Sequence, residues 1–245
     1  MRHTASAWLH TFPIDKAAQS CILAPEGVTH GIKWLMATFG ETMSLFYHQV
    51  LRGHGRMKNT IVYLIGYAGT GKYTIAKEIA VLTGAVIVDN QLINTPVFSV
   101  VGASGKTPLP AAVWPKIESI RRIVLDTVAE LAQPEASFIF TNELYEGKPM
   151  DRRWYEDVAL LATKRQARLL PVILRCELEE VCRRVTSPER AVRFKERSAD
   201  KTREKIRTYE LLRVDHPNCL ELDITNLSPI QAAQAILAHG EKRAP

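Results

Sequence analysis

The fold of this chain is decided by the stretch Gly66-Tyr67-Ala68-Gly69-Thr70-Gly71-Lys72-Tyr73-Thr74. An apolar run at residues 61–65 precedes it, and a helical pattern at residues 73–82 follows it. Glycines let several backbone N–H groups converge on an anion, and the N-terminus of the following helix adds partial positive charge. The stretch therefore predicts a phosphate-binding loop, and a plain glycine-rich turn is the alternative.

The same stretch supplies the predicted nucleotide-binding residues, among which Lys72 provides a mobile cation for the outer phosphates. At the position after the lysine, where the pattern has a Ser or Thr that touches Mg²⁺, this chain has Tyr73. We expect ATP to bind with Mg²⁺ held mainly by ATP oxygens, water and a carboxylate, or by Thr74 through a shifted geometry. The protein ligands of the metal stay unassigned. The predicted nucleotide-binding residues are Gly66, Ala68, Gly69, Thr70, Gly71, Lys72, Tyr73 and Thr74.

The composition of the 245 residues, 46% apolar and 24% charged, suits one soluble α/β domain with some extra sequence. No stretch approaches the ~18–20 uninterrupted apolar residues of a membrane span, and no secretory signal begins the chain. The four cysteines are scattered without metal-ligand spacing, which favours reduced thiols and a cytoplasmic protein. They are Cys21, Cys176, Cys182 and Cys219.

Residues 1–56 show no alternation of strands and helices, so we predict an N-terminal extension of unknown role, outside the core. Met57 is a candidate start of translation. Residues 57–245 form the predicted catalytic domain. A protein partner, if there is one, would dock on the extension.

Strand and helix patterns alternate from residue 57 onward, which predicts a five-stranded parallel sheet with helices on both faces. Residues 94–115, which are rich in Gly, Pro, Ser and Thr, predict a loop-rich insertion. Ligands bind at the carboxyl edge of such sheets, where the glycine loop, Asp89 and Asn142 are expected to gather. The predicted strands are 61–65, 85–88, 137–141, 169–174 and 220–224, and the helices after the insertion are 116–131, 151–167, 178–185 and one that begins at Pro229.

The net charge of +6 comes from one segment, residues 183–213, which holds 11 Lys or Arg and five Asp or Glu. This segment predicts either a phosphate-binding lid or a solvated helix with ion pairs such as Arg207–Glu210. Nucleic-acid binding is disfavoured, because the only aromatic residues among these charges are Phe194 and Tyr209.

Four segments in this order resemble the small P-loop kinases, a group that includes shikimate, gluconate and chloramphenicol phosphotransferases and, more distantly, nucleoside monophosphate kinases. The glycine loop resembles their first loop, and residues 88–93 resemble the segment that carries their acceptor-side aspartate. Residues 172–184 resemble their fourth strand and the helix that leads into the lid, and residues 222–229 their last strand and helix. The resemblance covers about residues 59–239, and only the first loop is specific by itself.

The resemblance implies the fold of a P-loop NTPase of the nucleoside-monophosphate-kinase type, with an acceptor region at about residues 90–133 and a lid at about 183–213. It implies that Lys72 neutralises the transferring phosphoryl group and that Asp89 orients or deprotonates the acceptor hydroxyl; a helix N-cap is the alternative for Asp89. Arg184, our choice of catalytic cation, is a lid candidate together with Arg190 and Arg193. Glu143 is a candidate for metal support or acceptor binding, or else a solvent-facing acid.

Together these features predict an ATP-dependent kinase that phosphorylates a hydroxyl of a small-molecule acceptor. The alternative is a nucleotide-dependent switch or ATPase that acts on a protein partner.

Overall fold

The computed structural model describes residues 57–103, 109–187 and 198–242. The predicted N-terminal extension, residues 1–56, lies outside them. Within the described ranges, no helix is both long and apolar enough to cross a bilayer. The three cysteines in these ranges, Cys176, Cys182 and Cys219, are free.

The centre of the domain is a five-stranded sheet in which every neighbouring pair is parallel, as the sequence predicts. The strands lie in the order β2-β3-β1-β4-β5, so β3 separates the strand before the glycine loop from the strand that ends at Asp89. The bounds are β1 Thr60–Ile65, β2 Val86–Asp89, β3 Phe138–Asn142, β4 Arg168–Arg175 and β5 Leu220–Asp223.

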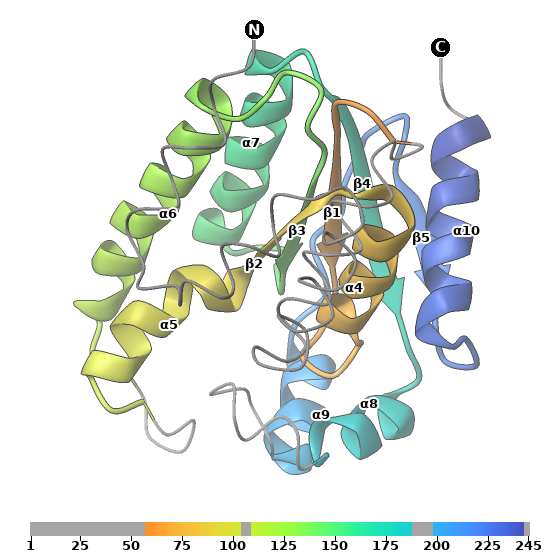
Figure 1. The fold of residues 1–245 in the computed structure, drawn as a ribbon. Coiled ribbons are helices and arrows are strands. Elements are labelled where there is room, and N and C mark those ends of the chain that lie inside the picture. Colours follow the sequence, from red (N-terminus) through yellow and green to blue (C-terminus); the bar gives the residue numbers. More distant parts are fainter. Residues whose placement is uncertain (1–56, 104–108, 188–197, 243–245) are drawn as a thin grey trace, which may run out of the picture. The chain divides into compact units, whose positions relative to one another are not determined.

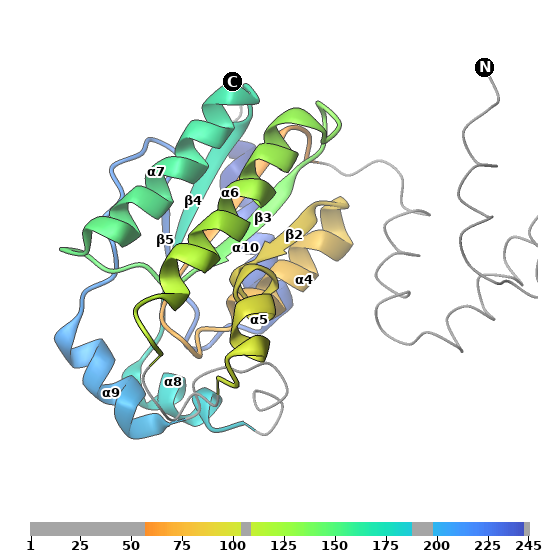
Figure 2. The same ribbon diagram turned by 90° about the vertical axis from the view of Figure 1, so that its left-hand side faces the viewer.

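Helices cover both faces of the sheet. One face is covered by α4 (Lys72–Thr83) and α10 (Pro229–Lys242), and the other by α6 (Val113–Glu130) and α7 (Pro149–Lys164), as Figures 1 and 2 show. Three further helices lie toward the carboxyl ends of the strands in Figure 1: α5 (Asn90–Val100), α8 (Leu178–Val185) and α9 (Ala199–Thr208).

Strand β1 shows why the sheet needs both helical layers. All six of its residues are buried, and alternate residues enter different cores. Tyr63 packs in the core under α6 and α7, whereas Val62 and Leu64 pack against α4 and α10. A strand buried on both faces reads as a continuous apolar run, which is the pattern at residues 61–65.

The predicted loop-rich insertion at residues 94–115 is wrong at both of its ends. Helix α5 continues through Pro96 to Val100, and α6 begins at Val113. Pro96 removes the N–H that would pair with the carbonyl of Leu92, but Leu92 is 61% exposed, so water can replace that partner. Buried Ile93 and Phe98 hold this helix against the core. Pro115 is tolerated in the first turn of α6, where backbone N–H groups have no partner within the helix.

Candidate nucleotide and acceptor site

The glycine loop joins β1 to α4, and its glycines are required by backbone conformation and by packing. Gly69 and Gly71 have φ angles of 95° and 75°, in the left-handed region that favours glycine. A Cβ on Gly69 would lie only 2.7 Å from a methyl carbon of Val185 on α8. The loop is therefore shaped by its own turn and by the close approach of α8.

Lys72 folds back over the start of the loop. Its ammonium donates hydrogen bonds to the carbonyl oxygens of Gly66, at 2.6 Å, and Tyr67, at 2.8 Å. The Thr70 hydroxyl donates to the same Tyr67 carbonyl, at 2.9 Å. The predicted phosphate-binding cation thus lies at the mouth of the loop.

Tyr73 and Thr74, the residues after the lysine, occupy the first turn of α4. The Tyr73 ring lies along the helix, with the Lys77 ammonium 5.7 Å from its centroid, and Thr74 is exposed. Across the described ranges, no group of three or more His, Cys, Asp or Glu side chains is placed to hold a metal ion.

Glu143 is neither a free acid nor solvent-facing. Its Oε1 atom accepts hydrogen bonds from the Ala68 backbone N–H, at 3.0 Å, and from the Tyr145 hydroxyl, at 2.5 Å. Its Oε2 atom lies 3.8 Å from the Lys205 ammonium of α9. The residue directly after β3 therefore connects the glycine loop to α9, a role that the sequence does not reveal.

Three tyrosines next to Glu143 reinforce this connection. The Tyr67 hydroxyl donates to the Tyr209 carbonyl, at 2.6 Å, just after α9 ends. The Tyr145 and Tyr209 rings lie 5.2 Å apart, and the Lys148 ammonium is 3.8 Å from the Tyr209 centroid. Burial and the nearby Glu143 charge raise the pKa of Tyr145, so its hydroxyl stays a donor. Sequence reasoning missed this cluster, because its members are far apart along the chain.

Asp89 is buried at the carboxyl end of β2 and occupies the N-cap position of α5. Its carboxylate makes no side-chain cap hydrogen bond. Instead it accepts a hydrogen bond from the Thr141 hydroxyl, at 2.6 Å, and this hydroxyl in turn accepts from the Asn90 N–H, at 3.2 Å. The alternative that Asp89 is a helix N-cap residue is thus right about its position at the start of α5. The Asp89 carboxylate, however, contacts the helix through the Thr141 hydroxyl and not directly.

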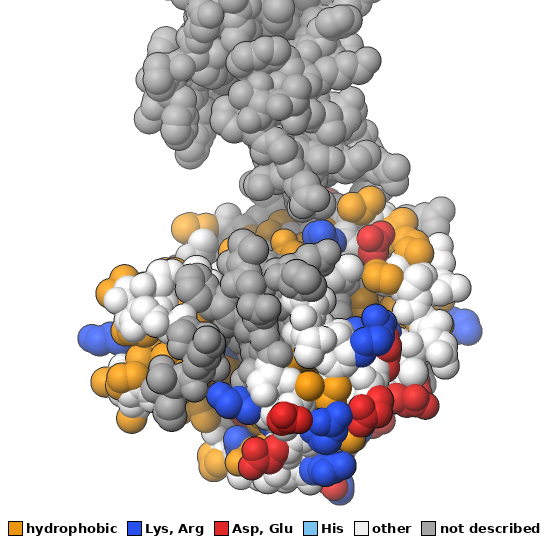
Figure 3. Space-filling view, turned by 90° about the horizontal axis from the view of Figure 1, so that it is seen from below, with side chains coloured by type: hydrophobic (Ala, Val, Ile, Leu, Met, Phe, Trp, Pro, Cys, Tyr) orange, Lys and Arg blue, Asp and Glu red, His pale blue; other side chains and the backbone are white. Residues whose placement is uncertain are grey.

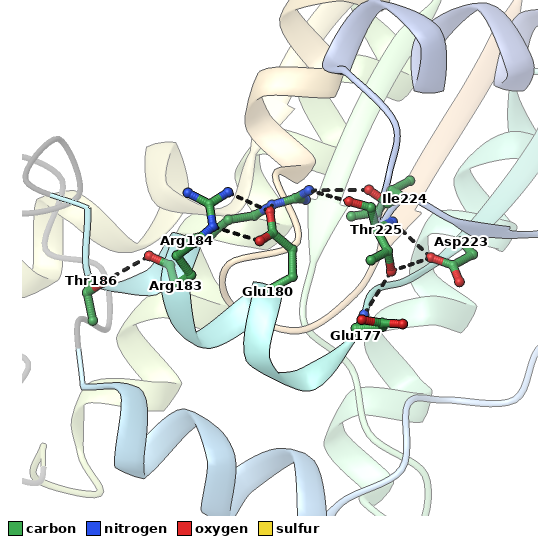
Figure 4. Close-up of polar contacts among 8 residues, drawn as sticks. All are labelled: Glu177, Glu180, Arg183, Arg184, Thr186, Asp223, Ile224 and Thr225. Atoms are coloured by element: carbon green, nitrogen blue, oxygen red, sulfur yellow. Dashed lines mark hydrogen bonds and ion pairs between the residues drawn. The ribbon is translucent and has the colours of Figure 1, made fainter.

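Arg184 on α8 faces the loop that follows β5 (Figure 4). Its guanidinium donates to the Glu180 carboxylate, at 2.6 Å, and to the carbonyl oxygens of Ile224 and Thr225, at 3.3 and 3.2 Å. The structure therefore brings Arg184 beside the last strand. The other two lid candidates, Arg190 and Arg193, lie outside the described residues.

Glu180 is the centre of the same network. It binds Arg183 through two hydrogen bonds of 2.7 Å and also binds Arg184, and these bonds lower its pKa to about 2. On the other side of the network, the Thr225 hydroxyl donates to Asp223 and accepts from the Glu177 N–H. The start of α8 is thus fastened to the β5–α10 loop.

The described part of the basic segment is laced with ion pairs. Acidic and basic side chains lie beside one another on the face seen from below in Figure 3. Arg203 pairs with Glu179, at 3.0 Å, and Arg213 pairs with Glu210, at 2.8 Å. The predicted pair Arg207–Glu210 is wrong, because α9 ends at Thr208 and Glu210 pairs with Arg213 beyond it.

Three amide side chains lie near the carboxyl edge of the sheet, and of these only Asn142 was predicted from the sequence as a residue of the edge. The side-chain oxygen of Asn142 accepts a hydrogen bond from the buried Tyr63 hydroxyl, at 3.0 Å. Its Nδ2 atom is buried without a hydrogen-bond partner, as are the side-chain oxygens of Gln91 and Asn94 on α5. Unpaired buried polar atoms are rare, so each of them requires an explanation.

Comparisons of the whole fold find solved structures with the same architecture. A proposed kinase from Chloroflexus aurantiacus superposes with a TM-score of 0.50 at 16% identity, over 78% of this chain and all of the other. A sugar kinase from Janibacter sp. gives 0.49 at 20% identity, over 75% and 95% of the two chains. A gluconokinase from Sinorhizobium meliloti gives 0.48 at 15% identity, over 76% and 96%.

At these identities the likeness shows the fold alone. No family model matches the sequence, and no curated protein matches it. The predicted fold is confirmed: the chain has the parallel α/β architecture of the small P-loop kinases.

Proposed function

We propose that this protein is a phosphotransferase that moves the γ-phosphoryl group of ATP to a hydroxyl of a small molecule. One observation carries the proposal. The glycine loop with Lys72 follows β1, the buried carboxylate of Asp89 ends β2, and only β3 lies between these two strands at the same edge of the sheet. A phosphate site beside a carboxylate is what the transfer of a phosphoryl group to a hydroxyl requires.

In this proposal the backbone N–H groups of residues 69–72 bind the nucleotide phosphates, and the Lys72 ammonium neutralises charge on the group in transfer. Asp89 accepts a hydrogen bond from the acceptor hydroxyl and aligns its oxygen with the γ-phosphorus. The new oxygen–phosphorus bond forms as the bond from the γ-phosphorus to ADP breaks. The hydroxyl proton passes to Asp89 and then to water.

Arg184 is the proposed cation on α8. Its guanidinium N–H groups donate to Glu180 and to two backbone carbonyl oxygens. To stabilise the negative charge of the phosphoryl group in transfer, the guanidinium would therefore have to leave Glu180 and bind phosphate oxygens instead. Kinases of this fold use ATP with Mg²⁺, but the two side chains at the end of β3, Asn142 and Glu143, do not fit a direct metal ligand. The Asn142 oxygen accepts from Tyr63, and Glu143 binds Ala68 and Tyr145. Nucleotide oxygens would therefore hold the metal.

The test uses the full chain with ATP labelled at the γ-phosphate, Mg²⁺ and a fractionated metabolite extract. We expect the label on one small molecule. Asp89→Asn should reduce this transfer by ~10²-fold or more, because it removes the base while keeping the shape of the side chain. Lys77→Ala, in the second turn of α4, is the matched control and should transfer label as the wild type does.

A nucleotide-dependent switch is the second candidate, and it is favoured by the contacts that join the glycine loop to α9. Ala68 is linked to Lys205 through Glu143, and Tyr67 binds the Tyr209 carbonyl. A change in the glycine loop on nucleotide binding could thus move α9 through these contacts. Label released only as free phosphate would contradict the kinase proposal and support this one.

The compartment and the partners are further parts of the proposal. Free thiols at Cys176, Cys182 and Cys219 support a cytoplasmic protein. A protein partner for residues 1–56 is proposed only for the switch.

A further inference from the structure

The side chain of Glu143 places a negative charge at the glycine loop, the proposed binding site of the nucleotide phosphates. Gly66, the first residue of the loop, donates its N–H to the backbone carbonyl of Asn142, at 3.2 Å. This contact continues the pairing of β1 with β3, and it brings the next residue, Glu143, beside the loop. The Oε1 atom of Glu143 accepts a hydrogen bond from the Ala68 N–H, at 3.0 Å. The loop therefore binds an anionic oxygen that the protein itself supplies.

A carboxylate at Ala68 competes with a phosphate group bound by the rest of the loop. Residues 69–72 are the proposed phosphate ligands, and Gly69 directly follows Ala68, so that the two Cα atoms are ~3.8 Å apart. Two anions at about this distance repel each other. The Lys72 ammonium donates to two carbonyl oxygens of the loop itself. Groups of the protein thus make the contacts that phosphate oxygens would make.

The backbone on both sides of Glu143 is held in place, so its side chain is the part that can leave the loop. Strand β3 precedes it. After it, Leu144 is fully buried, and its carbonyl accepts a hydrogen bond from the Leu212 N–H, at 3.0 Å. Tyr145 pairs with Leu211 in an isolated antiparallel bridge. Displacement of the carboxylate would therefore be a change of one side-chain rotamer.

Lys205 on α9 is placed to receive the displaced carboxylate. Its ammonium lies 3.8 Å from Oε2 of Glu143, while the other carboxylate oxygen contacts Ala68. The Lys205 and Glu143 side chains are 34% and 23% exposed, so both have room to change rotamer. A rotation toward α9 would shorten this ion pair and free the Ala68 N–H. The Lys205 charge therefore favours the form of the loop that is open to phosphates.

From these contacts we infer that Glu143 is autoinhibitory: its carboxylate occupies the glycine loop until the phosphates of ATP displace it toward Lys205. The inference rests on the proposed nucleotide site and concerns the regulation of that site. It goes beyond the transfer reaction, because the affinity for ATP is then set by a competition between ATP and a side chain of the same protein.

The first test compares ligands with and without phosphates, by calorimetric titration of the full chain at low salt. The ligands are ATP with Mg²⁺, inorganic tripolyphosphate and adenosine. Glu143→Gln keeps an oxygen for Ala68 but removes the charge, so ATP and tripolyphosphate should bind ~2–5-fold more tightly. Adenosine, which has no phosphate, should bind as it does to the wild type. Weaker binding of ATP and tripolyphosphate, or an equal gain for adenosine, would overturn the inference.

The second test approaches the same contact from α9. Lys205→Met should weaken ATP binding ~2–4-fold in the wild-type chain, because the displaced carboxylate loses its partner. In the Glu143→Gln background the same change should alter the Kd by less than ~1.5-fold. An equal loss in both backgrounds would mean that Lys205 binds the phosphates directly, which would overturn the inference. Lys164→Met, at the last residue of α7, is the matched control for the lost charge and should leave the Kd unchanged.

The nucleotide site and the autoinhibitory contact fail in different ways. If neither ATP nor tripolyphosphate binds to the wild type, the glycine loop is not a phosphate site, and the proposed function falls together with this inference. If both bind, and Lys72→Ala weakens their binding while Glu143→Gln leaves it unchanged, the nucleotide site stands and the autoinhibitory role alone is overturned. Circular dichroism of each variant checks that folded proteins are compared.

Discussion

The two halves of the sheet edge differ in how their polar groups are satisfied. On the proposed nucleotide side, Lys72, Glu143 and Arg184 all bind neighbouring groups of the protein. On the proposed acceptor side, Asp89 accepts from Thr141, but Asn142 and Asn94 keep buried polar atoms without partners. The first half is closed on itself and must exchange contacts to bind a ligand, whereas the second offers groups that only a ligand or water can satisfy. Changes on the nucleotide side should therefore alter ATP binding and leave acceptor binding as it is.

The largest effect is expected from Lys72→Ala. Loss of the cation that neutralises the transferring group should lower turnover by ~10²–10³-fold, while circular dichroism remains that of the folded wild type. Label transfer from ATP measures the rate, with Lys77→Ala as the control. Turnover within a few-fold of the wild type would show that the glycine loop is not the phosphate site.

A smaller effect is expected from Glu143→Gln, which keeps the acceptor oxygen for Ala68 but removes a negative charge at the loop mouth. ATP should bind ~2–5-fold more tightly, because a unit charge at about 4 Å is worth ~1 kcal/mol in water. Calorimetric titration at low salt measures the Kd, and the acceptor KM should not move. Weaker ATP binding would instead show that the carboxylate helps to hold the nucleotide or its metal.

Tyr73→Ser should have a smaller effect still, and in the favourable direction. If Tyr73 only replaces the usual hydroxyl residue, serine at this position should preserve or raise the Mg²⁺-dependent activity, within ~3-fold of the wild type. The measurement is a Mg²⁺ titration of label transfer, with Thr74→Ala beside it. A sharp loss in Tyr73→Ser would give the tyrosine ring a role of its own.

The smallest effect concerns stability and pH. The arginine contacts lower the pKa of Glu180 to about 2 from an ordinary value of 4.5. Their contribution to folding is therefore present above about pH 4.5 and is lost as the pH falls toward 2. Glu180→Gln should lower the thermal midpoint by less than ~3 °C at pH 6, because the pair is partly exposed, and by less again at pH 3. A difference that grows on acidification would contradict the assignment.

Local signals account for what the sequence predicted well. Helix α8 has the predicted bounds because its apolar spacing and its acidic and basic ends lie within eight residues. The insertion at residues 94–115 was misread because Pro96 is usually a helix breaker. Only the exposure of Leu92 and the burial of Phe98 make the helix tolerate it. The site was predicted in the same uneven way. Lys72 and Asp89 lie at the expected edge, whereas the contact of Glu143 with the Ala68 N–H was not predicted.

By itself, the sequence determined the glycine loop, the five strands, their parallel pairing and the helices on both faces of the sheet. Backbone conformation and hydrophobic periodicity are properties of short segments, so these features can be read locally. Tertiary structure alone decided that the Glu143 carboxylate meets the Ala68 N–H and that the Tyr63 hydroxyl donates to the Asn142 side-chain oxygen. Tyr63 and Asn142 are 79 residues apart in the chain. Only the pairing of β1 with β3 brings such side chains to hydrogen-bonding distance, and no local pattern encodes that contact.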